Sequence, residues 1–236
     1  MTKISNSSDR KKKMPRLVTE PDYLAVEGVI GVGKTSFARM LAEELKSEMM
    51  AEEVFENPFL ADFYKNKKRY ALQCQLNFLI SRYQQQQQLV MRDLFAQKIV
   101  ADYLFAKDAI FASVNLNERE LLLYEKIAAT LSSEIPKPDL VIYLQASTPT
   151  LLERIRKRNL GFEKPIDFDY LELLNKAYDY FFFNYSDTPL LVVKTDNIDF
   201  VNNPEHFTDL VSQLKKPING KKYYSPAGDL VDKQSI

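Results

Sequence analysis

Cysteine and histidine are almost absent from this chain of 236 residues. Cys74 is the one cysteine, which excludes an internal disulfide and suits a reducing compartment such as the cytoplasm. His206 is the one histidine, so a Ser-His-Asp or Cys-His arrangement elsewhere in the chain has no imidazole base. The chemistry of the chain therefore has to rest on other residue types.

The chain also lacks net charge and long apolar runs. Its 32 Lys and Arg residues balance 32 Asp and Glu residues, so no basic field recruits nucleic acid or an anionic membrane. No apolar stretch reaches the ~18 residues that cross a bilayer, and residues 1–19 lack the apolar core of a signal peptide. We therefore expect a small-molecule substrate, no nucleic-acid partner and no membrane, although the lysine run 11–13 leaves weak binding to a charged surface open.

A phosphate-binding motif begins at Gly28. The stretch "GVIGVGKTS" fills the pattern G-x-x-x-x-G-K-[ST], with a buried strand expected before it at 23–26 and apolar residues at helical spacing after it at 36–45. In such a loop, backbone N–H groups point at phosphate oxygens, Lys34 faces the outer phosphates, and the Thr35 hydroxyl holds Mg²⁺. The residues expected to bind a nucleotide are Gly28, Val29, Ile30, Gly31, Val32, Gly33, Lys34, Thr35 and Ser36.

Apolar strand-like runs alternate with helical segments along the chain, which is typical of a parallel sheet covered by helices. The strand-like runs are 23–26, 53–55, 99–102, 140–144 and 190–193. One long helix is expected over 68–97, where Gly and Pro are absent and glutamines 84–88 form a solvated face. Further helices are expected to begin near Asn117, with Glu120 completing a capping box, and at Thr148.

These segments predict an α/β fold with a five-stranded parallel sheet flanked by helices. They fit one domain over residues 20–215. Residues 1–19 are expected to be a solvated tail, because they lack the apolar core of a signal peptide, and residues 216–236 a poorly ordered one, because they are rich in turn formers.

Acidic residues follow several of the expected strands. Ligands of an open α/β sheet bind beyond the carboxyl ends of its strands. Glu56, Asp102, Asp196 and Asp199 stand at such ends. One acid alone is more often a solvated turn or cap residue, but two acids beside a phosphate-binding loop suit phosphoryl transfer. One of them holds Mg²⁺ opposite Thr35, and the other takes a proton from the attacking hydroxyl.

A cluster of arginines precedes a loop in "LLERIRKRNLGFEKP". Arg154 and Arg158 share one helix face, Arg156 lies between them, and Gly161 and Pro165 mark the loop that follows. Although a basic face is most often just solvated, arginines at the root of a movable segment can close over phosphates and exclude water. We therefore predict an arginine-rich lid, with Arg154 and Arg158 catalytic and Arg156 contacting the donor nucleotide.

Together these motifs resemble the deoxynucleoside kinases over residues 23–200. The resemblance implies that Glu56 in "ENPF" is the general base for the 5′-hydroxyl and that Tyr64 binds the sugar 3′-hydroxyl. It also implies that Asp102 is a Mg²⁺ ligand. Gln75 and Arg82, seven residues apart in "CQLNFLISR", would read the base.

Two further positions follow from the same resemblance. Asp108 stands where some members carry an aspartate that completes base recognition, with Lys107 as a rival because the alignment there needs a gap. Glu163 resembles the lid glutamate that reaches the sugar. Tyr103 stands where the family has an arginine after the acid, so the role of that arginine must be filled elsewhere or is lost.

The predicted activity is transfer of the γ-phosphate of ATP to the 5′-hydroxyl of a deoxynucleoside, with Mg²⁺, in nucleotide salvage. A purine deoxynucleoside is favoured because "ENPF" and "DYLFAKD" resemble the bacterial deoxyguanosine and deoxyadenosine kinases. Two alternatives stay open. A nucleoside monophosphate kinase of the thymidylate kinase type would need more cations for a second phosphate, and a non-catalytic P-loop module would need neither base nor lid. The resemblance also implies a homodimer through the long helix and a neighbouring one.

Overall fold

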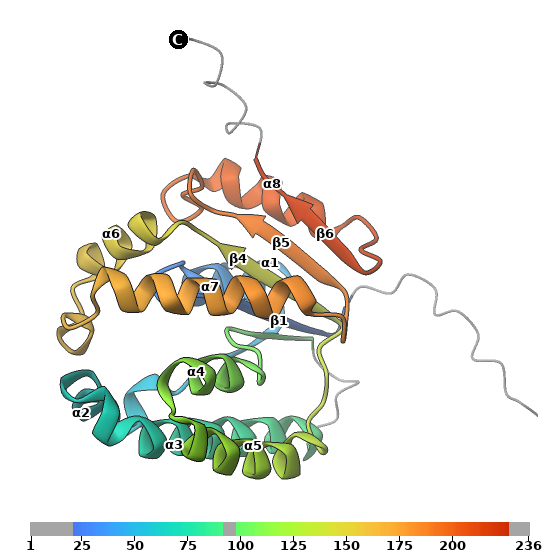
Figure 1. Cartoon of the computed structure of the whole chain (residues 1–236). Helices are drawn as coiled ribbons and strands as arrows, with labels where there is room; N and C mark the ends of the chain where they lie inside the picture. Colours follow the sequence, from blue (N-terminus) through green and yellow to red (C-terminus); the bar gives the residue numbers. More distant parts are fainter. Residues whose placement is uncertain (1–20, 92–97, 227–236) are drawn as a thin grey trace, which may run out of the picture.

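A six-stranded parallel sheet forms the centre of the computed structural model, which describes residues 21–91 and 98–226 (Figure 1). The strand order is β2-β3-β1-β4-β5-β6, and every pair is parallel. The strands are β1 (Tyr23–Gly28), β2 (Glu48–Met50), β3 (Ile99–Ala101), β4 (Leu140–Gln145), β5 (Leu190–Lys194) and β6 (Lys221–Tyr224). Their carboxyl ends therefore meet along one edge, which is where an open α/β sheet binds ligands.

Helices lie on both sides of this sheet, with α7 in front of it and α1 behind it in Figure 1. The α-helices are α1 (Lys34–Glu44), α2 (Leu60–Lys65), α3 (Lys67–Met91), α4 (Lys107–Asn115), α5 (Glu118–Ser132), α6 (Thr148–Arg158), α7 (Phe168–Asn184) and α8 (Pro204–Leu214). Two short 3-10 helices, η1 (Val54–Glu56) and η2 (Gly161–Glu163), complete the described elements. Among the described helices, none has the length and apolarity that crossing a membrane requires.

The α/β class predicted from the sequence is confirmed, but the strand count of five is wrong. The second strand is Glu48–Met50, whereas the run at 53–55 lies largely in η1. The sixth strand lies at 221–224, inside the segment expected to be a tail. Both strands form edges of the sheet. Edge strands are short and half-exposed, so they lack the continuous apolar run that marks a buried parallel strand.

Long-range contacts hold β6 in place. Its backbone pairs with β5, and the Lys221 ammonium donates to the carbonyl oxygens of Phe182 and Phe183 at 2.8 and 2.5 Å. Those carbonyls belong to the last turn of α7, where a cation is favourable. The expected tail at 1–19 lies outside the described residues, as do 227–236.

The helix starts that local signals predicted lie within two residues of the observed ones, whereas α2, α4, α7 and α8 were not predicted. The capping box of Asn117 and Glu120 begins α5 as predicted, with the Asn117 side chain accepting from the backbone N–H of Glu120 at 3.1 Å. The helix expected at Thr148 does begin there, although Ser147 is its capping residue. The long helix runs over Lys67–Met91, and its expected continuation over 92–97 lies outside the described residues.

Candidate active site

The phosphate-binding loop between β1 and α1 is held in an unusual backbone conformation. Gly31 and Gly33 have φ angles of +87° and +102°, and a Cβ on Gly31 would lie 2.8 Å from the Leu151 carbonyl oxygen. The Lys34 ammonium lies across the loop and donates to the carbonyl oxygens of Gly28 and Val29 at 2.7 and 3.3 Å. Burial, and after it the nearby charge of Lys107, lower the pKa of Lys34 to about 8.

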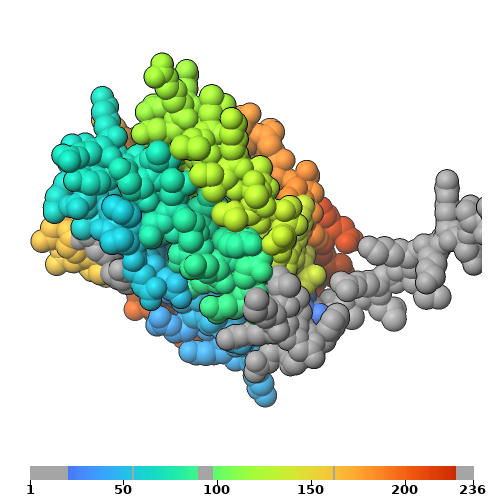
Figure 2. All heavy atoms as spheres, turned by 90° about the horizontal axis from the view of Figure 1, so that it is seen from below, coloured from blue at the N-terminus to red at the C-terminus, as the bar shows by residue number. Residues whose placement is uncertain are grey.

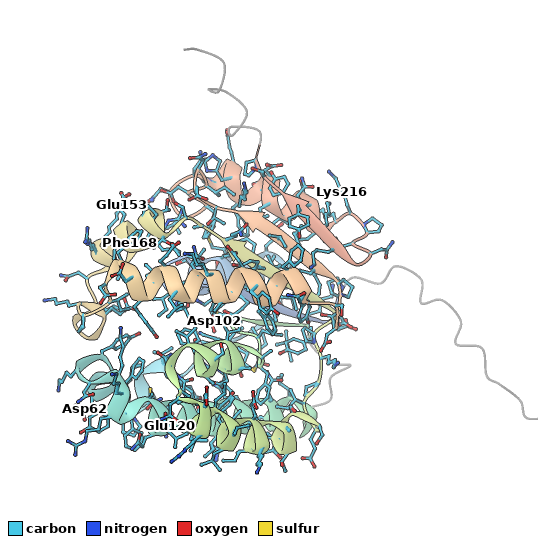
Figure 3. The ribbon with its side chains drawn as sticks, viewed as in Figure 1. Asp62, Asp102, Glu120, Glu153, Phe168 and Lys216 are labelled. Carbon is cyan, nitrogen blue, oxygen red and sulfur yellow. The ribbon has the colours of Figure 1, made fainter. Side chains whose placement is uncertain are left out.

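Asp102 connects this loop to the segment after β2. One carboxylate oxygen accepts from the Thr35 hydroxyl at 2.7 Å, and the other accepts from the backbone N–H of Glu52 at 2.7 Å. Asp102 follows β3 directly and lies inside the molecule, whereas Asp62 and Glu120 lie toward its surface (Figure 3). The acid expected to ligate a metal therefore lies beside the hydroxyl expected to do the same.

A pocket opens next to Asp102, and Glu52 supplies one of the buried carboxylates that line it. Its side chain is 8% exposed and accepts from Arg82 and from the Lys107 ammonium, the latter at 2.5 Å. Burial alone would raise the pKa of this carboxyl, but the charges of Lys107 and Arg82 hold it well below its usual range.

The structure does not bring Glu56 to this pocket. Glu56 is exposed at the end of η1 and is not among the pocket-lining residues. The position of Glu56 outside the pocket has a physical reason. The second strand ends at Met50, and the hydrogen bond from Glu52 to Asp102 turns the chain inward at Glu52, four residues before Glu56.

Three residues expected to read a base lie together at the far end of the pocket. Arg82 forms an ion pair with Asp108, and both side chains are almost fully buried. Gln75 lines the same space, and its buried amide oxygen has no hydrogen-bond partner among the described residues. Lys107 and Asp108, the two candidates for the base-recognition position, both line the pocket but have different partners. Lys107 contacts Glu52, and Asp108 contacts Arg82.

Residues of the expected sugar and lid region close the pocket on another side. Tyr64 is buried in its lining, and Glu163 accepts from the Arg158 guanidinium at 2.5 Å. Burial of Glu163 is nearly complete, whereas the Arg158 side chain is 45% exposed. Arg158 therefore keeps much of its side chain exposed while it anchors Glu163.

The other lid arginines behave differently. Arg154 donates to the carbonyl oxygens of Val32, Thr195 and Ile198 at 3.2, 2.6 and 3.3 Å, so it joins the phosphate-binding loop to the segment after β5. Arg156 is exposed and does not line the pocket. The structure thus brings one of the three arginines, Arg158, to the pocket.

An open groove lies on the other side of the phosphate-binding loop. Its lining comes from three segments: Gly31–Gly33 with Ser36, the α6 residues Thr150, Glu153, Arg154, Lys157 and Arg158, and residues 196–202 after β5. The carboxylates of the two acids in that segment accept hydrogen bonds from nearby backbone N–H groups. Asp196 accepts from the backbone N–H of Ser147 at 2.8 Å and from the Thr150 hydroxyl at 3.0 Å, and Asp199 accepts from the backbone of Asn202.

Sequence reasoning missed two buried acids of the site, Glu52 and Glu27. Glu27 ends the apolar strand β1, and it accepts from the backbone N–H groups of Gly28 and Leu104, both at 2.8 Å. Burial raises its pKa. A charge inside an apolar strand was a signal that could have identified Glu27. For Glu52 the signal was the pair of acids Glu52 and Glu53 that follows the observed strand β2. The predicted strand at 53–55 concealed it, because it placed Glu52 before the strand.

Tyr103 does not fill the place of the arginine that the resemblance led us to expect. Its side chain is fully buried away from the pocket, and its hydroxyl accepts from Gln86 at 3.5 Å. The cation next to Glu52, besides Arg82, comes instead from Lys107 at the start of α4.

A phosphate-binding loop between a pocket lined by buried charged side chains and an open groove is the arrangement expected of a P-loop phosphotransferase. Residues 24–219 match the family described as deoxynucleoside kinase, and the chain belongs to that family. It is therefore an enzyme that phosphorylates deoxynucleosides, as the sequence predicted.

Relatives and solved structures agree with this assignment. The chain is 38% identical to deoxyguanosine kinase of Bacillus subtilis over 83% of this chain and 97% of that one. It is 37% identical to deoxyadenosine kinase of Dictyostelium discoideum, over 81% and 78%. Among solved structures, deoxyadenosine kinase from M. mycoides with bound dCTP superposes with a TM-score of 0.70 at 28% identity, over 81% of this chain and 98% of that one.

Proposed function

We propose that the protein transfers the γ-phosphate of ATP to the 5′-hydroxyl of a deoxynucleoside, in nucleotide salvage. The observation that carries this proposal is the buried Glu52 carboxylate, which lies between the P-loop side of the pocket and the ion pair of Arg82 and Asp108. A base bound at that ion pair directs the 5′-hydroxyl of its sugar toward Glu52 and the phosphate-binding loop.

In this proposal Glu52, and not Glu56, accepts the proton of the attacking hydroxyl. It is ionised in the resting site because Lys107 and Arg82 stabilise its charge. Lys34 binds the outer phosphates of the donor, and Arg158 faces the migrating phosphoryl group from the lid. Arg154 acts indirectly, since its bonds hold the loop that cradles the phosphates.

Thr35 and Asp102 would hold Mg²⁺. Their 2.7 Å hydrogen bond directs one hydroxyl and one carboxylate oxygen toward the same point, which suits a metal that takes most of its other ligands from phosphates and water. The described residues contain no cluster of three or more Asp, Glu, His or Cys that could hold a metal, which suits an ion that arrives with the nucleotide. When bound, Mg²⁺ neutralises charge that develops between the β- and γ-phosphates.

The acceptor is favoured to be a nucleoside over a nucleoside monophosphate. A second dianionic phosphate needs cations that are free to bind it. Arg82 is committed to Glu52 and Asp108, and Arg158 is committed in part to Glu163. A neutral hydroxyl beside a carboxylate fits this arrangement better than a phosphate does.

A purine deoxynucleoside remains the favoured substrate. Gln75, Arg82 and Asp108 offer donors and acceptors to one base edge, and relatives at 37–38% identity are named for deoxyguanosine and deoxyadenosine. A purine between Phe78 and Phe111 would cover the apolar walls of the pocket.

A homodimer and a cytoplasmic location complete the proposal. Ile80 of α3 and Leu122 and Leu123 of α5 are exposed. Figure 2 shows the surfaces of these two helices side by side, so they form a continuous face for a second copy. A reducing compartment suits the one cysteine, Cys74, which is buried and unpaired.

The test of the proposed function is ADP release from Mg-ATP by the full chain, with each of the four deoxynucleosides in turn. We expect release only when a deoxynucleoside is present, fastest with deoxyguanosine or deoxyadenosine, and a 5′-monophosphate as product by mass spectrometry. Lys34→Ala is the inactive control. ADP release that ignores deoxynucleosides, or that requires a monophosphate acceptor, would contradict the proposal.

A further inference from the structure

Lys107 is a buried lysine, and the acid with which it forms an ion pair among the described residues is Glu52. Its side chain is 8% exposed, and its ammonium donates to Glu52 at 2.5 Å. Arg82 contacts both Glu52 and Asp108, so two cations and two carboxylates form a neutral cluster. A buried charge of this kind is stable only with a partner of opposite sign.

Phosphoryl transfer changes that balance. When Glu52 takes the proton of the substrate hydroxyl, its carboxylate becomes neutral, and Arg82 remains paired with Asp108. Lys107 then carries the unmatched positive charge of the cluster. In the same step the hydroxyl oxygen forms a bond to phosphorus, the bond from phosphorus to the leaving nucleoside diphosphate breaks, and a phosphate with two negative charges stands on the substrate.

The Lys107 ammonium borders the space in which that phosphate forms. It lines the pocket together with Lys34 and Thr35 of the donor side, and its charge contributes to the lowered pKa of Lys34. Among the described pocket residues the other cations are Lys34, Arg82 and Arg158. Arg82 keeps Asp108, and Arg158 lies at Glu163, so Lys107 is the cation released by the chemistry itself.

We propose that Lys107 is a catalytic residue whose ion-pair partner changes during the reaction. It leaves Glu52 and pairs with the transferred phosphoryl group, and so binds the phosphate of the product. This inference rests on the proposed function, because it needs a hydroxyl acceptor that gives its proton to Glu52. It makes Lys107 selective for the phosphorylated product over the unphosphorylated substrate.

The test compares two affinities in the full chain by titration calorimetry without donor nucleotide: that for the preferred deoxynucleoside and that for its 5′-monophosphate. Lys107→Met should weaken monophosphate binding roughly 10- to 100-fold, the range for one hydrogen bond to a charged group, and should change nucleoside binding less than about threefold. Lys107→Arg should restore most of the loss. Lys137→Met removes the lysine of an exposed ion pair with Asp187 and should change neither affinity.

A second comparison, for the case that Lys107→Met does not fold, includes a double variant in which the cluster stays neutral. Glu52→Gln alone should bind the monophosphate more tightly than the wild type does, because Lys107 is then unmatched from the start. Adding Lys107→Met to Glu52→Gln should abolish that gain.

Equal losses for nucleoside and monophosphate would overturn the proposal, since Lys107 would then only hold the pocket together. A monophosphate affinity that is unchanged in Lys107→Met relative to the wild type, or unchanged in the double variant relative to Glu52→Gln, would overturn it as well. A wild-type chain that binds neither compound would instead refute the proposed function.

Discussion

Replacing Glu52 by glutamine tests which of two nearby acids performs the chemistry. Glutamine keeps the size of the side chain and an oxygen that can accept from Arg82, but it cannot take the proton of a hydroxyl. The matched control is Glu56→Gln, the same change four residues later at an exposed position outside the pocket.

Two magnitudes follow from the environment of Glu52. Loss of a general base lowers the rate typically ~10²–10⁴-fold. A fall at the low end is compatible with a carboxylate that mainly orients the hydroxyl, because a loose phosphoryl-transfer transition state needs little help from a base. Removing one charge from a buried ion pair also costs stability, up to about 3–5 kcal/mol when the partner is left unmatched.

The assay is steady-state ADP release with saturating Mg-ATP, together with a thermal unfolding curve for each variant. Glu52→Gln should lower kcat within that range in protein that is folded at the assay temperature, whereas Glu56→Gln should stay within about threefold of the wild type. If Glu52→Gln keeps near-normal turnover, or if Glu56→Gln shows the large defect, the assignment of Glu52 as the proton acceptor is refuted.

Three further outcomes are expected. Asp196→Ala removes the carboxylate that accepts hydrogen bonds from the start of α6, and should cost about 1 kcal/mol of unfolding free energy. The Tm should fall by about 2–4 °C with kcat unchanged, and a lower kcat would show that Asp196 does more than cap the helix. Arg154→Met should raise the KM for ATP more than the KM for the nucleoside, because its bonds hold the phosphate-binding loop; equal effects on both would speak against this role. Replacing Arg82 and Asp108 together by apolar residues of similar size should relax the choice of base without changing ATP affinity, and an unchanged ranking of the four deoxynucleosides would exclude them as the selective pair.

Local sequence was enough for the parts of this protein that depend on neighbours along the chain. The phosphate-binding loop needs glycines at positive φ, a lysine and a threonine within nine residues, and the pattern predicted all of them. The buried strands β1, β3, β4 and β5 were predicted because strands covered on both faces are apolar throughout. Together with the capped helices, these signals determined the α/β class and the family resemblance.

The tertiary structure alone decided the edges of the sheet. β2 and β6 are short strands with little apolar character, and each exists because its backbone pairs with a strand distant in sequence. For β6, the bonds from Lys221 to the end of α7 add a contact that no local pattern can reveal.

The same holds for the choice between the two candidate bases. Glu52 and Glu56 are both acids after a strand, and the sequence shows only that one of them could face the acceptor. The backbone bond from Glu52 to Asp102, and the ion pairs with Arg82 and Lys107, turn Glu52 inward and leave Glu56 in solvent. Because those partners come from the end of β3, the middle of α3 and the start of α4, the direction of the side chain is set by packing between distant segments and not by the order of residues around it.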